Sequence, residues 1–485
     1  MNRRSFLTAS AAALAATALS PDLLHAAAAS AGGWTLAVAD VEADIPRQTL
    51  RRLHGRAPVD LSGTLFRNGP AKFHRPGGSA GHWFDGDGMV RAFRVNEGQA
   101  TLTARFLDTN KRRVDSAAGA VVTPGFGTPT GKGAQVASND DVNPSNISVM
   151  QAGGEMWALW ETGSPMVFDP VTLETKGLHT FRPDLAHMPF LAHPRVEPNG
   201  RVWNLGLFGK QAIVWRLAPG GSLEAAEPIE LPRASYIHDF TATERHLVIV
   251  LQPWVQDHFA MPYMNSLTWK PELGTQILVV DKADFSQRRI FDAPPFFFFH
   301  LGDAWEEADG AIRFDAAMDV DASFATVGAV GIIQGKDIRG ADPQLGLISL
   351  KPNGSVDITR AGLVGEFPRT DPRFAGANRR HTVHLTKGAR DRPLMQAVAV
   401  TDWKTQKTDI HDFGPSQVVE EMVFVPRPGS SAEFDGWLMG TSINLLAGKT
   451  ELHLFDARRV SAGPLASWQA DVPLPVTFHG VFVPS

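Results

Sequence analysis

Apolar residues along most of this chain occur in short runs, and no stretch sustains the 3.6-residue period of a long amphipathic helix. The runs are rich in β-branched and aromatic residues and have the length of strands. They cover residues 201–207, 212–217, 246–251, 276–280, 345–351, 394–400, 422–425 and 451–455. This pattern predicts an all-β protein.

Turn residues separate the runs. Pro-Asn-Gly occurs at 198–200 and at 352–354, Ala-Pro-Gly-Gly at 218–221, and Asp169 begins a further turn at 169–172. Such clusters favour tight connections between neighbouring antiparallel strands. The chain contains 45 Gly and 34 Pro, which suits many short strands better than long helices.

A β-propeller is the architecture that this pattern favours. Blades arranged around an axis allow residues that are distant in sequence to meet at a central site. Seven blades of this chain would average about 65 residues, longer than the roughly 40 to 50 of regular repeats, so large insertions are expected. The sequence shows no clean internal repeat that would fix the number of blades.

The first 31 residues have the features of a targeting segment. Arg3 and Arg4 give a twin-arginine start, an alanine-rich apolar run follows, and small residues at 26–31 offer cleavage points. The apolar core is about 13 residues, against the roughly 20 needed to span a bilayer. We therefore expect a twin-arginine signal peptide at 1–31, a periplasmic or exported protein, and a single domain at 32–485; a retained interfacial helix is the alternative.

Composition narrows the possible chemistry. The chain has no cysteine, which excludes disulfides, thiolate metal sites and cysteine nucleophiles. Its formal net charge is −5 and its basic residues form no cluster, so we expect no nucleic-acid partner.

His300 follows four consecutive phenylalanines, 296–299, which cannot all face solvent. A neutral imidazole carried into an apolar interior needs a partner, and a metal ion is one such partner. Taken singly, a buried histidine is more often a core residue. His381 and His384 form a competing metal pair, but their spacing on a strand would point them to opposite faces. The phenylalanines themselves are more typical of a core wall than of substrate contacts.

Several motifs resemble, in order, those of the carotenoid cleavage oxygenase family, which includes the retinal pigment epithelium isomerase. The resemblance begins with Gly-Thr-Leu-Phe-Arg-Asn-Gly-Pro at 63–70 and His-Trp-Phe-Asp-Gly-Asp-Gly-Met-Val at 82–90. It continues through the segments 159–165, 366–369, 421–426 and 478–480 and those around His193, His238 and His300. The family implies a seven-bladed propeller, capped by loops and helices, with a non-haem iron on its axis.

The resemblance also implies a set of metal ligands. Carried over residue by residue, one Fe(II) per chain would be held by His193, His238, His300 and His479. Neutral imidazoles suit Fe(II) and leave coordination positions open to O2. The family pattern adds three carboxylates that accept hydrogen bonds from the distal nitrogens of the last three histidines: Glu161, Glu366 and Glu421 respectively.

Glu420 beside Glu421 leaves a register ambiguity of one residue. We prefer Glu421 because the family's Val-Phe-Val-Pro run aligns with 423–426, although Met422 replaces the usual proline.

The implied reaction is oxidative cleavage of a conjugated carbon–carbon double bond, with a lipophilic small-molecule substrate and O2 as partners and two carbonyl products. A carotenoid or apocarotenoid is the favoured substrate. Phe84 and Phe126 are the expected walls of its tunnel, by resemblance.

Three alternatives stay open. Lignostilbene-type enzymes of the family engage a phenol with a Tyr and a Lys, but these positions align near Phe126 and Ser145, which cannot activate a phenol. The chain could instead be a non-catalytic propeller that binds a lipophilic ligand. A non-oxidative isomerase like the retinal enzyme is the third.

The segment 254–267 is apolar, interrupted by Pro262 and too irregular to be assigned as a strand. One interpretation is an insertion that packs on the propeller. The other is an exposed apolar lip, including Phe259 and Met264, that touches a membrane surface and passes the substrate to the tunnel.

Overall fold

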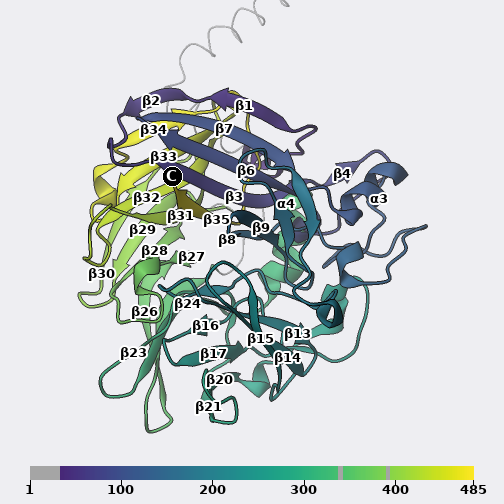
Figure 1. Cartoon of the computed structure of the whole chain (residues 1–485), viewed down its shortest axis with the longest axis vertical. Helices are drawn as coiled ribbons and strands as arrows, with labels where there is room; N and C mark the ends of the chain where they lie inside the picture. Colours follow the sequence, from purple (N-terminus) through teal and green to yellow (C-terminus); the bar gives the residue numbers. More distant parts are fainter. Residues whose placement is uncertain (1–32, 337–341, 389–393) are drawn as a thin grey trace, which may run out of the picture.

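Seven sheets form a ring in the computed structural model, which describes residues 33–336, 342–388 and 394–485 (Figure 1). Each sheet is antiparallel and has four or five strands. The prediction of a seven-bladed propeller is therefore confirmed. The expected signal peptide at 1–31 lies outside the described residues.

The first four sheets contain strands from residues 45–293 and one strand from the C-terminal end of the chain. From the axis outwards, they are β35 (His479–Pro484), β3 (Gly63–Lys72), β6 (Asp87–Asn96), β7 (Gln99–Phe106) and β1 (Ile45–Thr49); β8 (Ser148–Ala152), β9 (Glu155–Leu159), β10 (Met166–Phe168) and β11 (Thr175–Leu178); β12 (Arg195–Val196), β13 (Val202–Phe208), β14 (Gln211–Leu217) and β15 (Leu223–Glu230); and β16 (Thr241–Ala242), β17 (His246–Leu251), β20 (Thr275–Asp281) and β21 (Arg288–Ala293).

The other three sheets follow in chain order. They are β22 (Phe297–Leu301), β24 (Ile312–Asp319), β25 (Gln344–Leu350) and β26 (Val356–Val364), with β23 (Trp305–Glu306) also paired to β24; β27 (Glu366–Arg369), β28 (His381–Thr386), β29 (Ala397–Asp402) and β30 (Lys407–Asp412); and β31 (Gln417–Pro426), β32 (Gly436–Asn444), β33 (Lys449–Asp456), β34 (Ala466–Gln469) and β2 (Arg51–Gly55).

The innermost strands of neighbouring sheets contact one another around the axis. Strand β35 contacts β8 and β31, and β27 contacts β22 and β31. A residue on any of these strands can therefore reach the centre of the ring, however far apart the strands are in sequence.

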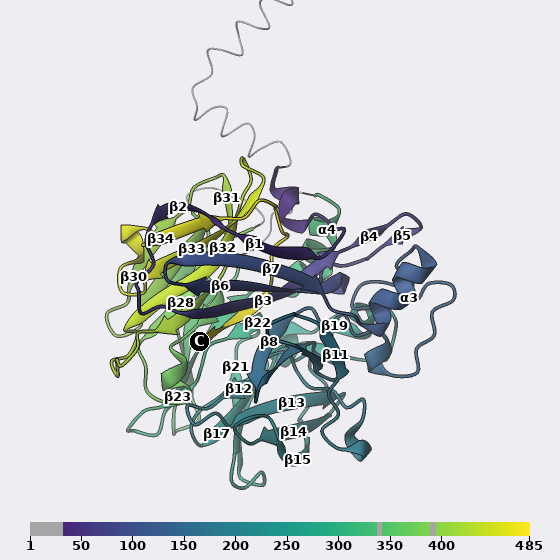
Figure 2. The same cartoon turned by 45° about the horizontal axis from the view of Figure 1, so that its top comes forward.

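The two ends of the chain close the ring. Strand β35 pairs with β3, placing His479 opposite Asn68, and β2 forms the outer edge of the last sheet. Figure 2 shows β1, β7, β6 and β3 side by side in this closing blade. Gly480 permits the close pairing, because a Cβ there would lie 2.5 Å from the carbonyl oxygen of Phe66.

The apolar core lies between neighbouring blades. Val250 and Ile277 of the fourth sheet pack with Phe314 and Ile348 of the fifth, and all four are fully buried. Each such side chain contributes about 1.5–3 kcal/mol relative to an exposed one, so the blades stabilise one another in pairs.

Two hairpins and several short helices lie outside the seven sheets. Two hairpins are β4 (His74–Arg75) with β5 (Gly78–Ser79) and β18 (Trp254–Gln256) with β19 (Leu267–Trp269). Helix α3 (Asn110–Ala118) begins at the Thr109 cap, and a π-helical turn η7 (Phe324–Gly328) leads into α4 (Ala329–Ile333). The 3-10 turns are η1 (Gly33–Val38), η2 (Trp83–Asp85), η3 (Asn139–Asp141), η4 (Pro183–Leu185), η5 (Tyr263–Ser266), η6 (Pro271–Leu273), η8 (Pro372–Phe374) and η9 (Val460–Ala462). Within the described ranges, none of the helices has the length and apolar character needed to cross a membrane.

The strand predictions hold closely. Each of the eight apolar runs overlaps a strand, although the run at 394–400 begins three residues before β29. The four turn clusters connect β12 to β13, β25 to β26, β14 to β15 and β10 to β11. The segment 254–267 is a short hairpin with a 3-10 turn in its loop, which explains why no single period described it.

Candidate metal centre

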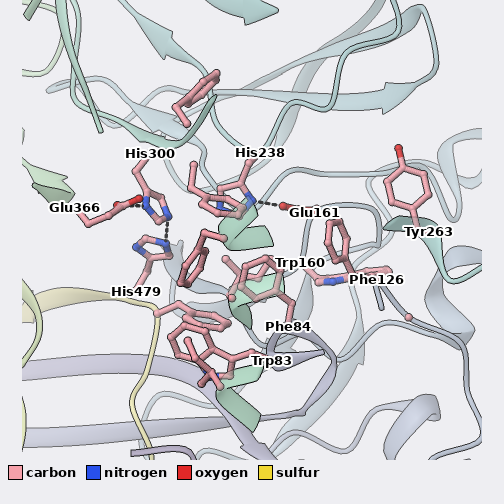
Figure 3. Close-up of a pocket in the computed structure, with 18 of the residues that line it drawn as sticks. Trp83, Phe84, Phe126, Trp160, Glu161, His238, Tyr263, His300, Glu366 and His479 are labelled. Atoms are coloured by element: carbon pink, nitrogen blue, oxygen red, sulfur yellow. Dashed lines mark hydrogen bonds and ion pairs between the residues drawn. The ribbon is translucent and has the colours of Figure 1, made fainter. Parts of the chain in front are cut away.

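Four histidines from different sheets meet on the propeller axis. His193 precedes β12, His238 precedes β16, His300 lies in β22 and His479 begins β35. One ring nitrogen from each lies within 4.8 Å of those of the other three. The Nε2 atoms of His193 and His238 are 3.0 Å apart, and those of His300 and His479 are 3.1 Å apart. Figure 3 shows His300, His479 and His238 turned toward this common centre.

Three carboxylates hold the distal nitrogens of three of these histidines. His300 Nδ1 lies 2.6 Å from Glu366 Oε2, and His479 Nδ1 lies 2.9 Å from Glu421 Oε1. His238 Nδ1 contacts Glu161 Oε1 (Figure 3). These are the pairs expected from the sequence.

The tautomers that these contacts impose fit a metal ion. An ionised carboxylate only accepts hydrogen bonds, so Nδ1 of His300 and of His479 carries the proton and each Nε2 presents a lone pair. Two lone pairs 3.1 Å apart repel each other unless a metal ion, or a proton on one of the rings, lies between them. The four imidazoles can therefore hold a metal ion, with the carboxylates fixing ring orientation and increasing donor strength.

Burial keeps two of the imidazoles neutral. It lowers the pKa of His193 well below its ordinary value, with repulsion from His479 and His238 adding to the effect. Burial also lowers the pKa of His479 to about 3. At His300 burial acts in the same direction, but the carboxylates of Glu366, Asp239 and Glu421 together outweigh it and raise the pKa.

β-Bulges aim several of these side chains. An extra residue interrupts the pairing of β22 between Phe298 and Leu301, that of β27 between Glu366 and Arg369, and that of β31 between Val419 and Met422. A bulge redirects side chains that strict alternation would otherwise place. In β27, Phe367 adopts φ +54° and stacks on the His300 ring, with centroids 4.8 Å apart.

The bulge in β31 separates the roles of the two adjacent glutamates. Glu421 faces His479 and also accepts hydrogen bonds from Gly480 N and Arg67 Nη1, each at 2.9 Å. Burial alone would raise its pKa, but Arg369, His479 and Arg67 together hold that pKa well below the usual range. Glu420 instead accepts from Thr477 N at 2.6 Å and from Thr441 Oγ1 at 2.9 Å.

An ionic clamp ties three of the histidine segments together, and the sequence interpretation missed it. Arg195 Nη2 donates to Asp239 Oδ1 at 2.6 Å, and its Nη1 donates to Asp303 Oδ1 at 3.2 Å. Asp239 Oδ2 in turn accepts from Leu301 N at 2.8 Å. Arg195, Asp239 and Asp303 follow His193, His238 and His300 by two, one and three positions. A charged residue shortly after each histidine was the signal in the sequence.

Tyr236 was also missed. Its hydroxyl donates to Glu161 Oε1 at 2.7 Å, so Glu161 accepts from both Tyr236 and His238. Its position two residues before His238 on an extended segment was the only signal.

The competing pair His381 and His384 lies away from this centre. His384 is buried and contacts Thr401 Oγ1 at 2.9 Å through Nε2, and burial lowers its pKa to about 4. His381 lies 3.1 Å from Glu433 and stacks on Phe434. The two rings serve different faces of β28, as their spacing indicates.

A cavity of about 1050 Å³ opens beside the metal centre. Its wall includes His238, His300 and His479 and is mostly apolar. The phenylalanine and tryptophan residues that line it are Trp83, Phe84, Phe126, Trp160, Phe208, Phe259, Phe297, Phe298, Phe299, Phe324, Phe367 and Phe478.

Both expected wall residues, Phe84 and Phe126, line this cavity, with ring centroids 5.7 Å apart. The His-Trp-Phe-Asp motif positions them. His82 accepts from Phe84 N at 3.1 Å, and Asp85 accepts from Phe126 N at 2.7 Å. Ser145, by contrast, is fully buried and donates to Asn143 Oδ1 at 2.9 Å.

The four phenylalanines at 296–299 belong to two different clusters and do not form a single wall of the core. Phe296 and Phe298 pack in the core between the fourth and fifth sheets, whereas Phe297 and Phe299 belong to an aromatic cluster with Phe126. Strand alternation accounts for the division, and Phe297, Phe298 and Phe299 all reach the cavity wall.

Comparison with known proteins identifies the family. The model of the retinal pigment epithelial membrane protein family matches residues 38–484. The chain belongs to this family, that of the carotenoid cleavage oxygenases.

The family includes relatives that match over most of their length. An apocarotenoid-15,15'-oxygenase from Synechocystis sp. is 29% identical over 459 residues, covering 88% of this chain and 91% of that protein. A lignostilbene-alpha,beta-dioxygenase isozyme III from Sphingomonas paucimobilis is 26% identical over 465 residues, covering 88% and 92%. The solved structure of cobalt-substituted Synechocystis ACO, an apocarotenoid oxygenase, has a TM-score of 0.82 at 24% identity, covering 93% of this chain and 98% of that chain. The structural likeness shows that the family fold is kept.

Replacing a histidine tests the metal centre. His238→Ala or His300→Ala should weaken metal binding severely, because one of four ligands is lost and the Glu161 or Glu366 carboxylate loses its imidazole partner. Metal content after anaerobic Fe(II) loading and desalting measures this. His381→Ala, which removes an imidazole outside the centre, should bind metal normally. Full occupancy in either centre variant would contradict the assignment.

Replacing the carboxylates tests the hydrogen bonds to the ligands. Glu366→Gln should retain part of the metal but lower affinity or rate by about 10- to 100-fold, because an amide oxygen is a weaker acceptor. Glu421→Gln should act similarly through His479. Glu420→Gln, the matched control one residue away, should lower the melting temperature while leaving metal affinity near that of the parent. An unchanged affinity in Glu366→Gln would show that this carboxylate does not support the metal.

Proposed function

We propose that this protein is an Fe(II)-dependent oxygenase that cleaves a conjugated C=C bond of a carotenoid or apocarotenoid, giving two carbonyl products. The observation that carries the proposal is the opening of a four-histidine centre into a large aromatic-walled cavity. The relatives named above are oxygenases, which supports the same reaction class.

The four imidazoles are the donors that would hold the metal. Neutral nitrogen ligands suit Fe(II), and no thiolate is needed. Bound in this way, Fe(II) supplies the activation of O2. Overall, one O2 is consumed as the C=C bond breaks and two C=O bonds form, so the balance requires no net proton or external reductant.

The remaining contribution of the chain is binding and positioning. The cavity volume of about 1050 Å³ lies at the upper end of the roughly 300–1,000 Å³ of small-molecule sites, which suits a long apolar substrate. Phe84 lies between Phe126 and Phe299, with ring centroids 5.7 and 5.5 Å away, and gives the wall a fixed aromatic surface. These rings exclude water and determine which double bond lies beside the histidines.

An aryl-alkene substrate of the lignostilbene type is the second candidate. Phe126 and Ser145 provide no phenol-binding group, as the sequence indicated. However, the structure brings Tyr263 against Phe126 from another loop, with ring centroids 6.2 Å apart. The Tyr263 hydroxyl is therefore a possible binding group for the phenol of an aryl-alkene substrate.

A panel assay tests the reaction. The protein is loaded anaerobically with Fe(II), then supplied with O2 and carotenoids, apocarotenoids or stilbenes in parallel. Mass spectrometry of the aldehydes should locate one cleaved bond, with stoichiometric O2 uptake. Isomerised product without O2 uptake would indicate a non-oxidative isomerase, and binding without any product would indicate a binding protein.

The rim of the cavity offers a route for a lipophilic substrate. Phe259, Val327, Val136 and Phe208 line the cavity and are also exposed, Phe259 by 73% and Val327 by 60%. Met264, which the sequence interpretation placed with Phe259, is instead partly buried and packs against the cluster around Phe126. An exposed apolar rim supports substrate transfer from a membrane surface.

The rim can be tested by adding charge. Phe259→Asp with Val327→Asp should weaken liposome binding by about 100-fold or more, because two lost apolar contacts are each worth roughly 1.5–3 kcal/mol. Turnover of membrane-dispersed substrate should fall in parallel, while metal content and turnover of a short water-soluble analogue are retained.

The matched control adds the same charge elsewhere. Val59→Asp with Val171→Asp changes two exposed apolar residues that do not line the cavity. Equal effects of the two double variants, or a lowered melting temperature for the rim variant, would contradict a membrane-contacting rim.

A further inference from the structure

Tyr263 is a polar group that the metal centre does not use. The chain has only two tyrosines, and both rings pack against Phe126, with centroids 5.8 Å away for Tyr236 and 6.2 Å away for Tyr263. The Tyr236 hydroxyl is engaged by Glu161 at 2.7 Å. Tyr263 lines the cavity, and its hydroxyl makes no hydrogen bond to any residue in the described ranges.

The loop that carries Tyr263 is fixed to the cavity wall. Tyr263 begins η5, between β18 and β19. Its backbone N donates to Gly125 O at 3.1 Å, and the N of Met264 donates to Phe126 O at 2.8 Å. Because both bonds are to the segment of Phe126, the phenol has a defined position relative to the cavity wall.

The surroundings make this phenol a hydrogen-bond donor. Burial, with the nearby Glu161 carboxylate, raises the pKa of Tyr263 to about 12, so the hydroxyl keeps its proton at neutral pH. The same carboxylate disfavours an anionic partner at this point. A neutral oxygen is the acceptor that the site accommodates.

Tyr263 stands apart from the metal centre. In Figure 3 it lies beyond Phe126 and Glu161, on the side remote from His300 and His479. A molecule that extends along the cavity from the histidines would meet the hydroxyl away from the reacting double bond.

We propose that Tyr263 donates a hydrogen bond to a neutral oxygen at one end of the substrate, so that the enzyme selects alkenes with an oxygenated terminus. This inference rests on the proposed function. The oxygen is a hydroxyl or carbonyl, carried either by the end of an apocarotenoid or by the ring of an aryl alkene. Tyr263 thereby determines specificity and sets how far the substrate advances past the metal centre.

Tyr263→Phe isolates the hydroxyl, because the ring that packs on Phe126 is retained. The variant is compared with the parent on two pairs of substrates: an apocarotenal with and without a ring hydroxyl, and 4-hydroxystilbene against stilbene. In the pair that the parent cleaves, kcat/KM for the oxygenated member should fall by about 5- to 10-fold, as for the loss of one neutral hydrogen bond. The member without oxygen should be unaffected.

Tyr236→Phe is the matched control. It removes the other phenolic hydroxyl, which acts through Glu161 and His238, so it should change kcat for both members of a pair by the same factor. The paired comparison separates recognition of the substrate end from disturbance of the metal centre. The substrate pair whose kcat/KM changes in Tyr263→Phe shows whether the bound oxygen belongs to a polyene or to a phenol.

Equilibrium binding to the metal-free protein gives an independent measurement. Quenching of tryptophan fluorescence should show the oxygenated member binding about 5- to 10-fold more tightly to the parent, and the two members binding equally to Tyr263→Phe. If the parent shows no preference, or if the variant keeps it, the inference is overturned. Failure of the parent to cleave any substrate would reject the proposed function alone, because the binding ratio still decides the role of Tyr263.

Discussion

The structure depends on the burial of four imidazoles whose ring nitrogens face one another. The Nε2 atoms of His300 and His479 face each other across 3.1 Å, and three carboxylates fix the distal sides of the set. Within the described part of the chain, Glu161 and Glu366 have no Lys or Arg ion-pair partner, whereas Glu421 pairs with Arg67 and Arg369. A divalent cation would therefore balance the two carboxylates that lack an Arg, and four neutral imidazoles can hold such a cation.

The propeller brings the ligands near the axis, but local departures from regular strand geometry aim several of them. His300, Glu366 and the pair Glu420 and Glu421 lie at bulges in β22, β27 and β31. Arg195 then links the segments of three histidines through Asp239 and Asp303. The fold brings the histidines together near the axis, and the bulges and ion pairs set the orientation of their side chains.

The same division explains how far the sequence could be interpreted. The strands around 246–251 and 345–351 were predictable because apolar content and turn residues alone produce them. Four dispersed histidines became a candidate site only through the order of their motifs. The choice between Glu420 and Glu421 could not be made from alternation, because the bulge lets both side chains be buried toward different partners.

Tyr263 shows why comparison position by position misses part of a site. The aligned position near Phe126 lacks a hydroxyl, which argued against recognition of an oxygenated ring. A cavity wall, however, is assembled from several loops, and the β18–β19 hairpin places a phenol against Phe126 from a segment with no regular period. A hydrogen-bond donor needs the right location in the cavity and not a particular place in the chain. A change of side chain in the β18–β19 hairpin therefore alters the groups that face the cavity without moving the histidines or their carboxylates.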